Sequence, residues 1–276
     1  MKTAHLSGND LLISSNESYV CYDDQGAGTI PVIFIHGFPF DKSTWQPQVD
    51  FLKETNRVIS YDIRGFGKSP MGKGPISINQ FAEDLICLMD SLIIDKAVVC
   101  GFSLGGYIFL NAISRFPERF SGVILCDTQC AADPVEVIEK RMNSISAIHS
   151  NGIADFADET ISNVFCHETL EKNKKLTDRI KNVILATDSF SITETLQAIT
   201  NRNETCSTLK NIRIPALILC GESDTITPPS KAEYLFNHIV PSKREIIKNA
   251  GHMSNLEQPG VFNQYLRDFI QQLPGK

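Results

Sequence analysis

The stretch "VVCGFSLGGYIF", residues 98–109, places a serine at a point where the hydrophobic pattern changes. Residues 98–100 are β-branched or small and apolar, which is typical of the end of a buried strand. Residues 104–113 carry apolar side chains at helical spacing, and Pro117 marks the end of that pattern. The change predicts a sharp turn from strand to helix, with Ser103 on the turn itself.

Two glycines flank Ser103 at equal distances along the chain. Gly101 and Gly105 lack a Cβ atom, so they tolerate the crowded backbone that such a turn needs. The turn would lift the hydroxyl into the open at the N-terminus of the helix, where backbone N–H groups and the helix dipole favour negative charge. The pattern G-x-S-x-G in this context predicts that Ser103 is a nucleophile.

A serine hydroxyl needs a general base, and histidine is the most suitable side chain. Of the six histidines, His252 lies in the loop "NAGHMSN" after the last predicted strand, which is where a base could approach the nucleophile. His36 ends the predicted strand "VIFI". We interpret the others as terminal, surface or helix-cap residues: His5, His149, His167 and His238.

The acid that orients the base is expected at the end of an intervening strand. The run "ALILCGESD" ends in Asp224, and the order Ser103, Asp224, His252 is that of nucleophile, acid and base in one class of serine hydrolases. Two rivals remain, Glu222 in the same run and Asp127 at the end of an earlier strand.

The oxyanion of a tetrahedral intermediate needs two hydrogen-bond donors. One is predicted to be the backbone N–H of Leu104, directly after the nucleophile. The loop "HGFPF" supplies the second through the backbone N–H of Phe38. A simpler interpretation is that the aromatic side chains of this loop only pack against the core. The two interpretations are compatible, because the hydrogen-bond donor belongs to the main chain.

Short apolar runs alternate with helical patterns between residues 31 and 128, which predicts a mostly parallel sheet with helices on both faces. The runs "LLISS" and "SYVCYDD" before it predict an antiparallel hairpin at one edge. Residues 129–210 lack the strand pattern and show helical patterns instead, which predicts an inserted helical cap. We therefore expect a core domain made of residues 1–128 and 211–276.

The first helix of this insertion is expected to begin after Pro134 and to present one apolar face. The residues on that face are Val135, Ile138, Met142, Ile145 and Ile148. Further helical patterns follow in "GIADFADETISNVF", "LTDRIKNVILAT" and "SITETLQAIT". Placed over the strand ends, such an insertion would act as a lid.

Composition excludes several classes of function. The net charge of −6 and the absence of a basic stripe argue against a nucleic-acid partner. No apolar run is long enough for a signal peptide or a membrane span, so we expect a cytoplasmic protein that binds no membrane.

Cys100, Cys126 and Cys220 lie in predicted strands and are expected to be reduced core thiols. The sequence contains no CxxC pair and no cluster of cysteines and histidines, so we expect no metal site.

Five motifs stand together in one order: "HGFPFDKSTW", "YDIRGFGKS", "GFSLGG", "GESDTITPP" and "AGHMSNLEQP". With these motifs the chain resembles an α/β-hydrolase over nearly its whole length. The ending "HMSNLEQP" and a four-helix cap are similar to the branch of 3-oxoadipate enol-lactonases and small carboxylesterases. The resemblance implies structural roles for Asp62, Arg64 and Gly65. A serine nucleophile also differs from the aspartate of the epoxide hydrolase and haloalkane dehalogenase branches.

These features predict hydrolysis of a small carboxylic ester or lactone through an acyl-enzyme, without cofactor or metal. Alternatives on the same scaffold are cleavage of an amide at an N-terminal proline, thioester hydrolysis and cofactor-free perhydrolysis. A ligand receptor or binding protein that keeps the three side chains belongs to a different class. An enol-lactonase acting on an anionic lactone would offer a cation, for which Lys42, Lys140 and Arg141 are candidates. The sequence leaves the oligomeric state open.

Overall fold

The computed structural model describes residues 7–15, 18–74 and 76–273. It contains one eight-stranded sheet with the strand order β1-β2-β4-β3-β5-β6-β7-β8. The strands are β1 (Gly8–Ser15), β2 (Ser18–Gln25), β3 (Val32–Ile35), β4 (Val58–Tyr61), β5 (Ala97–Phe102), β6 (Phe120–Cys126), β7 (Ala216–Gly221) and β8 (Ser242–Ile247).

Six of these strands run parallel, from β4 through β3, β5, β6 and β7 to β8. Strand β2 pairs antiparallel with both β1 and β4, so the predicted hairpin lies at one edge of the sheet. Every residue of the central strands β3 to β7 is buried except Ser121 in β6, which explains their apolar runs. The predicted fold class, a mostly parallel α/β sheet, is confirmed.

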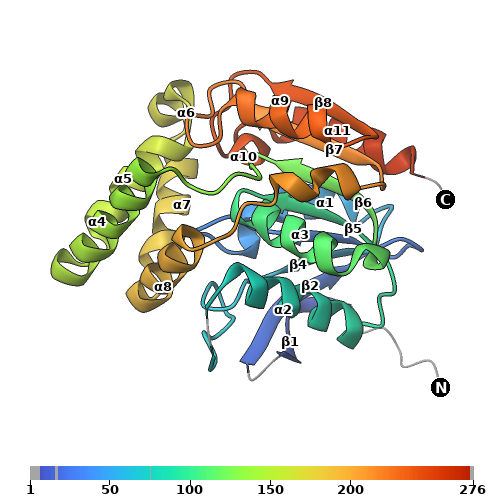
Figure 1. Cartoon of the computed structure of the whole chain (residues 1–276), viewed down its shortest axis with the longest axis horizontal. Helices are drawn as coiled ribbons and strands as arrows, with labels where there is room; N and C mark the ends of the chain where they lie inside the picture. Colours follow the sequence, from blue (N-terminus) through green and yellow to red (C-terminus); the bar gives the residue numbers. More distant parts are fainter. Residues whose placement is uncertain (1–6, 16–17, 75, 274–276) are drawn as a thin grey trace.

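Helices cover both faces of the sheet (Figure 1). Helices α2 and α3 pack against each other on one face, and α1 and α11 pack against each other on the opposite face. These core helices are α1 (Gln46–Leu52), α2 (Ile78–Ser91), α3 (Leu104–Arg115), α9 (Pro229–His238), α10 (Ser254–Glu257) and α11 (Pro259–Gln271). The described chain also contains the short 3₁₀ helices η1 (Lys42–Trp45), η2 (Pro117–Arg119) and η3 (Cys206–Asn211).

Between β6 and β7 the described chain is helical, and Figure 1 shows these helices beside the carboxyl ends of the strands. They are α4 (Val135–Asn151), α5 (Ala154–Val164), α6 (His167–Lys172), α7 (Lys174–Leu185) and α8 (Ser189–Thr200). The short helix α6 was not predicted, because six residues show too little periodicity.

The predicted apolar face of α4 is buried only in part. Ile148 is buried and Ile145 is half-buried against the core, whereas Val135 and Met142 are exposed. Helix α4 packs mainly against α8 and α5 rather than on the sheet, so it meets a smaller apolar surface than a helix of the core does.

The motif "YDIRGFGKS" has the structural setting that the resemblance implies. Arg64 is buried and donates from Nε and Nη2 to the two carboxylate oxygens of Asp84, both at 2.7 Å. The Asp62 carboxylate accepts hydrogen bonds from the backbone N–H of Lys42 and of Lys68. Gly65 has a φ of +84°, which favours glycine. These contacts tie the loop after β4 to the loop after β3.

A disulfide joins Cys130 to Cys206, at the two points where the chain leaves and re-enters the core. No local pattern predicts this pair, because the two cysteines lie 76 residues apart. Cys100, Cys126 and Cys220 are free and buried, as predicted. In the described part of the chain, no helix is long and apolar enough to cross a membrane.

Candidate active site

Ser103 lies between the last residue of β5 and the first residue of α3, with φ +51° and ψ −110°. Such a backbone conformation is rare for a residue with a side chain and stores strain. A Cβ atom at Gly101 would lie 2.6 Å from the carbonyl oxygen of Gly105, and one at Gly105 would clash with the carbonyl oxygen of Ile35. The two glycines therefore make the turn possible.

The structure brings Ser103, His252 and Asp224 into one hydrogen-bonded chain. His252 Nε2 lies 2.9 Å from Ser103 Oγ, and His252 Nδ1 lies 2.8 Å from Asp224 Oδ2. All three side chains are buried, and they come from loops that follow β5, β7 and β8. With the proton on Nδ1, the imidazole donates to Asp224, and Nε2 is free to accept the proton of the serine hydroxyl.

Asp224 is held as a carboxylate by several donors. Its Oδ1 accepts from the backbone N–H groups of Ile226 at 2.8 Å and Thr227 at 2.9 Å, and its Oδ2 also accepts from the Thr227 hydroxyl at 2.7 Å. Burial alone would raise the pKa of Asp224, but the charge and hydrogen bond of His252 and the Thr227 donors hold the pKa below its usual value.

The two rival acids contact neither Ser103 nor His252 by a hydrogen bond. Asp127 accepts from the backbone N–H of Gly221 at 2.8 Å and from the Ser254 hydroxyl at 2.5 Å. Burial and the nearby charge of Asp224 raise the pKa of Asp127 well above its usual value, whereas the pKa of Asp224 is lowered. Glu222 is exposed and accepts from the backbone N–H of Asn249 at 3.4 Å.

Among the other described histidines, none forms a hydrogen bond with Ser103. His36 is fully buried, donates from Nδ1 to the Gly37 carbonyl at 2.8 Å and accepts at Nε2 from the Ile63 backbone N–H at 2.9 Å. Burial lowers the pKa of His36, which fits this neutral form. The exposed ones are His149, His167 and His238, and His5 lies outside the described residues.

The backbone N–H groups of Phe38 and Leu104 are both free to bind an oxyanion, since neither donates to an acceptor among the described residues. The Gly37 carbonyl accepts from His36 Nδ1 at 2.8 Å and from the Phe40 backbone N–H at 3.0 Å. In a trans peptide the carbonyl and the N–H point in opposite directions. Anchoring the Gly37 carbonyl therefore fixes the direction of the Phe38 N–H.

A cavity of about 440 Å³ opens onto Ser103 and His252. Its walls come from the core loops and from helices α4, α5 and α8. The apolar lining residues include Phe38, Leu104, Tyr107, Val137, Phe156, Val164, Leu196 and Ile199, and the charged ones are Asp133, Lys140, Arg141, Glu159 and Lys231. A small, partly apolar molecule fits such a space.

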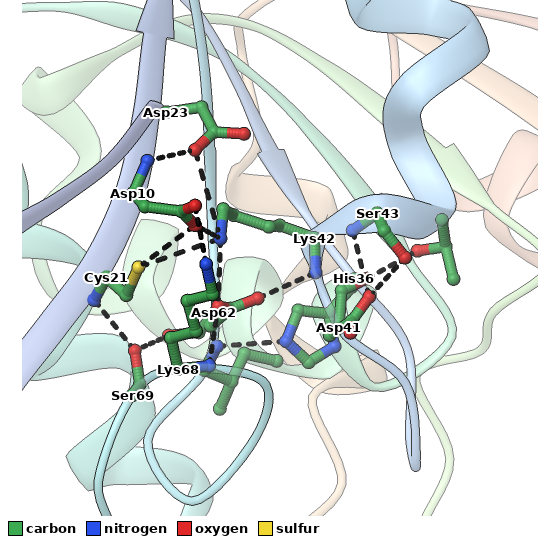
Figure 2. Close-up of polar contacts among 12 residues, drawn as sticks. Asp10, Cys21, Asp23, His36, Asp41, Lys42, Ser43, Asp62, Lys68 and Ser69 are labelled. Atoms are coloured by element: carbon green, nitrogen blue, oxygen red, sulfur yellow. Dashed lines mark hydrogen bonds and ion pairs between the residues drawn. The ribbon is translucent and has the colours of Figure 1, made fainter. Parts of the chain in front are cut away.

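Of the three candidate cations, Lys140 and Arg141 line this cavity and Lys42 does not. Lys42 points instead into a separate cluster of carboxylates (Figure 2), where Nζ lies 2.8 Å from Asp10 and 3.1 Å from Asp62. Burial lowers the pKa of Lys42, but Asp62, Asp10 and Asp23 together raise it above its usual value. Lys42 is thus a structural cation, and its candidacy as a substrate ligand was wrong.

One group of side chains in the described residues has the spacing of a metal site, namely Asp127, Cys220 and Asp224. The carboxylate oxygens of this group already accept hydrogen bonds from N–H and O–H donors of the protein. N–H and O–H donors directed at these oxygens disfavour the binding of a cation there. Hydrogen bonding therefore explains why these side chains lie close together.

Two supporting residues were missed from the sequence. Thr227 orients Asp224 and lies 3.4 Å from His252 Nδ1. Glu257 accepts from the backbone N–H of Gly251 at 2.7 Å and of Cys166 at 3.0 Å, so it ties the loop of His252 to the helical insertion. Thr227 lies in the motif "GESDTITPP" and Glu257 in "AGHMSNLEQP". Their positions in two motifs typical of the resembled family could have marked them as supporting residues.

Comparison with known proteins identifies the family of the fold. The sequence profile of a family described as having the alpha/beta hydrolase fold matches residues 30–259. The 3-oxoadipate enol-lactonase 2 of Acinetobacter baylyi is 29% identical over 232 residues, which cover 84% of this chain and 85% of that protein.

Two solved structures have the same fold over nearly the full length. A thermophilic esterase from Thermogutta terrifontis, solved with malate bound, has a TM-score of 0.91 at 29% identity, covering 96% of this chain and 99% of that one. The enol-lactonase from Burkholderia xenovorans LB400 has a TM-score of 0.89 at 27% identity, covering 95% and 100%. With the match of the family profile to most of its length, this chain belongs to the alpha/beta hydrolase family.

Proposed function

We propose that this hydrolase cleaves a small carboxylic ester or lactone through an acyl-enzyme formed on Ser103. The observation that carries the proposal is the hydrogen-bonded chain from Ser103 through His252 to Asp224, beside two free backbone N–H groups. The esterase and enol-lactonase relatives support the class of substrate. The residue roles rest on the geometry of this chain.

In the first half of the reaction, Ser103 Oγ attacks the substrate carbonyl while His252 Nε2 takes the hydroxyl proton. The N–H groups of Phe38 and Leu104 hold the resulting oxyanion, and Asp224 stabilises the imidazolium through Nδ1. When the tetrahedral intermediate collapses, the bond to the alcohol oxygen breaks and His252 returns the proton to it. For a lactone, that oxygen stays in the same molecule as the acyl group.

In the second half, His252 removes a proton from water, and the water oxygen attacks the acyl carbon. The second oxyanion is held by the same two N–H groups, and the acid leaves as Ser103 regains its proton. No electron transfer is involved, and water supplies every atom that the products gain.

We also propose that residues 129–210 form a cap that sets the range of substrates. Helices α4, α5 and α8 supply many of the cavity walls, whereas Ser103, Asp224 and His252 come from outside this segment. Exchange of side chains in these helices therefore changes which acyl groups fit, and leaves the reacting atoms in place.

A fluorophosphonate probe tests the nucleophile. One adduct per chain is expected, mapped to the peptide that contains Ser103, with none in Ser103→Ala. Labelling that persists in Ser103→Ala contradicts the proposal. A panel of p-nitrophenyl esters, lactones, a thioester and a proline amide identifies the preferred bond, with hydrogen peroxide added separately to detect perhydrolysis. A burst of product followed by stalled turnover indicates a receptor instead.

A further inference from the structure

We propose that Thr227 is a positioning residue for the base: its hydroxyl binds Asp224 Oδ2 and thereby weakens the hold of Asp224 on the imidazolium form of His252. This inference rests on the proposed roles of Ser103, Asp224 and His252, and it names the group that sets the pH range in which the base works. Thr227 lies in the loop between β7 and α9 and is 1% exposed.

Asp224 Oδ2 accepts hydrogen bonds from two different side chains. The Thr227 hydroxyl lies 2.7 Å from this oxygen, and His252 Nδ1 lies 2.8 Å from it. The other oxygen, Oδ1, is occupied by backbone N–H groups. Each donor draws the negative charge of a carboxylate toward itself, so less charge is left to stabilise the other partner. The Thr227 hydroxyl and the imidazole therefore compete for one oxygen.

The proton of the Thr227 hydroxyl has two acceptors within reach. Oγ1 lies 2.7 Å from Asp224 Oδ2 and 3.4 Å from His252 Nδ1. The shorter contact is to a carboxylate, which makes it the stronger hydrogen bond. The hydroxyl thus donates to Asp224 and turns a lone pair toward Nδ1, where a lone pair favours the tautomer with the proton on Nδ1. In that tautomer Nε2 is free to accept the proton of Ser103.

The backbone of Thr227 is held on both sides of its side chain. Its N–H donates to Asp224 Oδ1 at 2.9 Å, and its carbonyl accepts from the Cys220 thiol at 3.5 Å. A threonine side chain also has few favoured rotamers, because both of its substituents lie on Cβ. The hydroxyl is therefore fixed in direction, and burial keeps bulk water from competing for its hydrogen bond with Asp224.

Other titratable groups surround the base, and Thr227→Val leaves all of them in place. Asp127 at the end of β6 lies in the same cluster as Asp224 and Cys220, and Glu257 of α10 binds the loop of the base. Burial raises the pKa of Asp127, of Glu257 and of the Cys220 thiol. The charged residues that line the cavity are Asp133, Lys140, Arg141, Glu159 and Lys231. Two proteins that differ by one hydroxyl therefore report the effect of that hydroxyl.

The pH dependence of fluorophosphonate labelling at Ser103 tests this inference. Labelling needs a neutral base, so its rate falls as the pH drops, and the midpoint of the fall is measured. Thr227→Val keeps the shape of the side chain and removes the donor, so Asp224 stabilises the protonated imidazole more strongly. We expect the midpoint to rise by about 0.5 to 1 pH unit. Thr227→Ala removes the same donor and is expected to show the same rise, whereas Thr227→Ser is expected to keep the wild-type midpoint.

Thr44→Val is the matched control. Thr44 is also buried, and its hydroxyl donates to the Asp41 carbonyl at 2.8 Å, in η1. This variant is expected to lose stability in urea, as Thr227→Val does, but to keep the wild-type midpoint. Slower labelling of Thr227→Val at every pH, with an unmoved midpoint, would show a merely structural threonine and overturn the inference. The same rise in Thr227→Ser or in Thr44→Val also overturns it.

Proton NMR of the His252 Nδ1–H group separates this inference from the proposed chemistry. Spectra of the variants, labelled with ¹⁵N-histidine, are compared below the midpoint, after circular dichroism has shown that each protein is folded. Without the Thr227 donor, the hydrogen bond from Nδ1 to Asp224 strengthens, so its resonance is expected to move downfield in Thr227→Val and Thr227→Ala. An unmoved resonance contradicts the inference. A wild type that the probe does not label contradicts only the role of Ser103, and the NMR comparison then decides on Thr227.

Discussion

Replacement of Asp224 by asparagine preserves the size of the side chain and removes its charge. The orientation of the new amide is decided by the structure. Oδ1 accepts from two backbone N–H groups, of Ile226 and Thr227, so this position must keep the oxygen. The NH₂ group then occupies the position of Oδ2, which faces His252 Nδ1 at 2.8 Å. An NH₂ group there forces Nδ1 to accept rather than donate.

The consequence is a wrong tautomer of the imidazole. With Nδ1 unprotonated, the proton moves to Nε2, which then cannot take the proton of Ser103. In a serine protease with the same three types of side chain, this change lowers kcat by about 10⁴. We expect a loss of that order here, equal to about 5.5 kcal/mol of transition-state stabilisation.

The assay compares kcat of Asp224→Asn, Asp127→Asn and Glu222→Gln on one activated ester, after circular dichroism has shown that each variant is folded. Asp127→Asn and Glu222→Gln are expected to lose less than about tenfold. The pKa of Asp127 is raised, and an asparagine in its place can still accept from the backbone N–H of Gly221, while its NH₂ group can donate to the oxygen of the Ser254 hydroxyl. Glu222 is exposed. A large loss of kcat in Asp127→Asn, with the kcat of Asp224→Asn close to that of the wild type, would refute the assignment of Asp224 as the acid.

Other variants test the stability of the fold. The raised pKa of Asp127 means that the folded protein keeps a proton on this carboxyl at pH values above 3.8, where the unfolded chain loses it, so the contribution of Asp127 to stability falls as the pH rises. Asp127→Asn removes this contribution, so in urea unfolding the stability of the variant relative to the wild type is expected to increase with pH. Loss of the Cys130–Cys206 disulfide, by double replacement with serine, frees a loop of 76 residues and costs about 4 kcal/mol in the same assay. Arg64→Met leaves Asp84 charged and buried, and is expected to cost about 3–5 kcal/mol.

Much of the fold could be predicted because its signals are local. The strand runs correspond to β3 through β8, and the helical pattern in "INQFAEDLICLMDSL" corresponds to α2 (Ile78–Ser91). Buried parallel strands need continuous apolar residues, and helices on a sheet need one apolar face. Each type of element therefore has a recognisable order of apolar residues in the sequence. Helix α4 was harder to place, since it contacts other helices and its apolar residues are partly exposed.

The side chains that the sequence singled out as nucleophile, acid and base lie within hydrogen-bond distance in the structure. Their positions after strands made this arrangement predictable, because the carboxyl ends of parallel strands share one edge of the sheet. The Asp133–Arg202 contact and the disulfide join residues that are 69 and 76 positions apart. Neither lies on a strand end, so no local pattern marks them.

The proposed cap and the loop of His252 are joined by hydrogen bonds. The backbone N–H of Met253, next to His252, donates to the Val164 carbonyl at 3.0 Å, and Glu257 binds the backbone of Cys166 and of Gly251. Both residues that flank His252 are thus held, directly or through Glu257, by the junction between α5 and α6. Deleting the cap would release the loop of the base as well as open the cavity. Point variants in α4 therefore separate recognition from catalysis where truncation cannot, because α4 makes neither of these contacts.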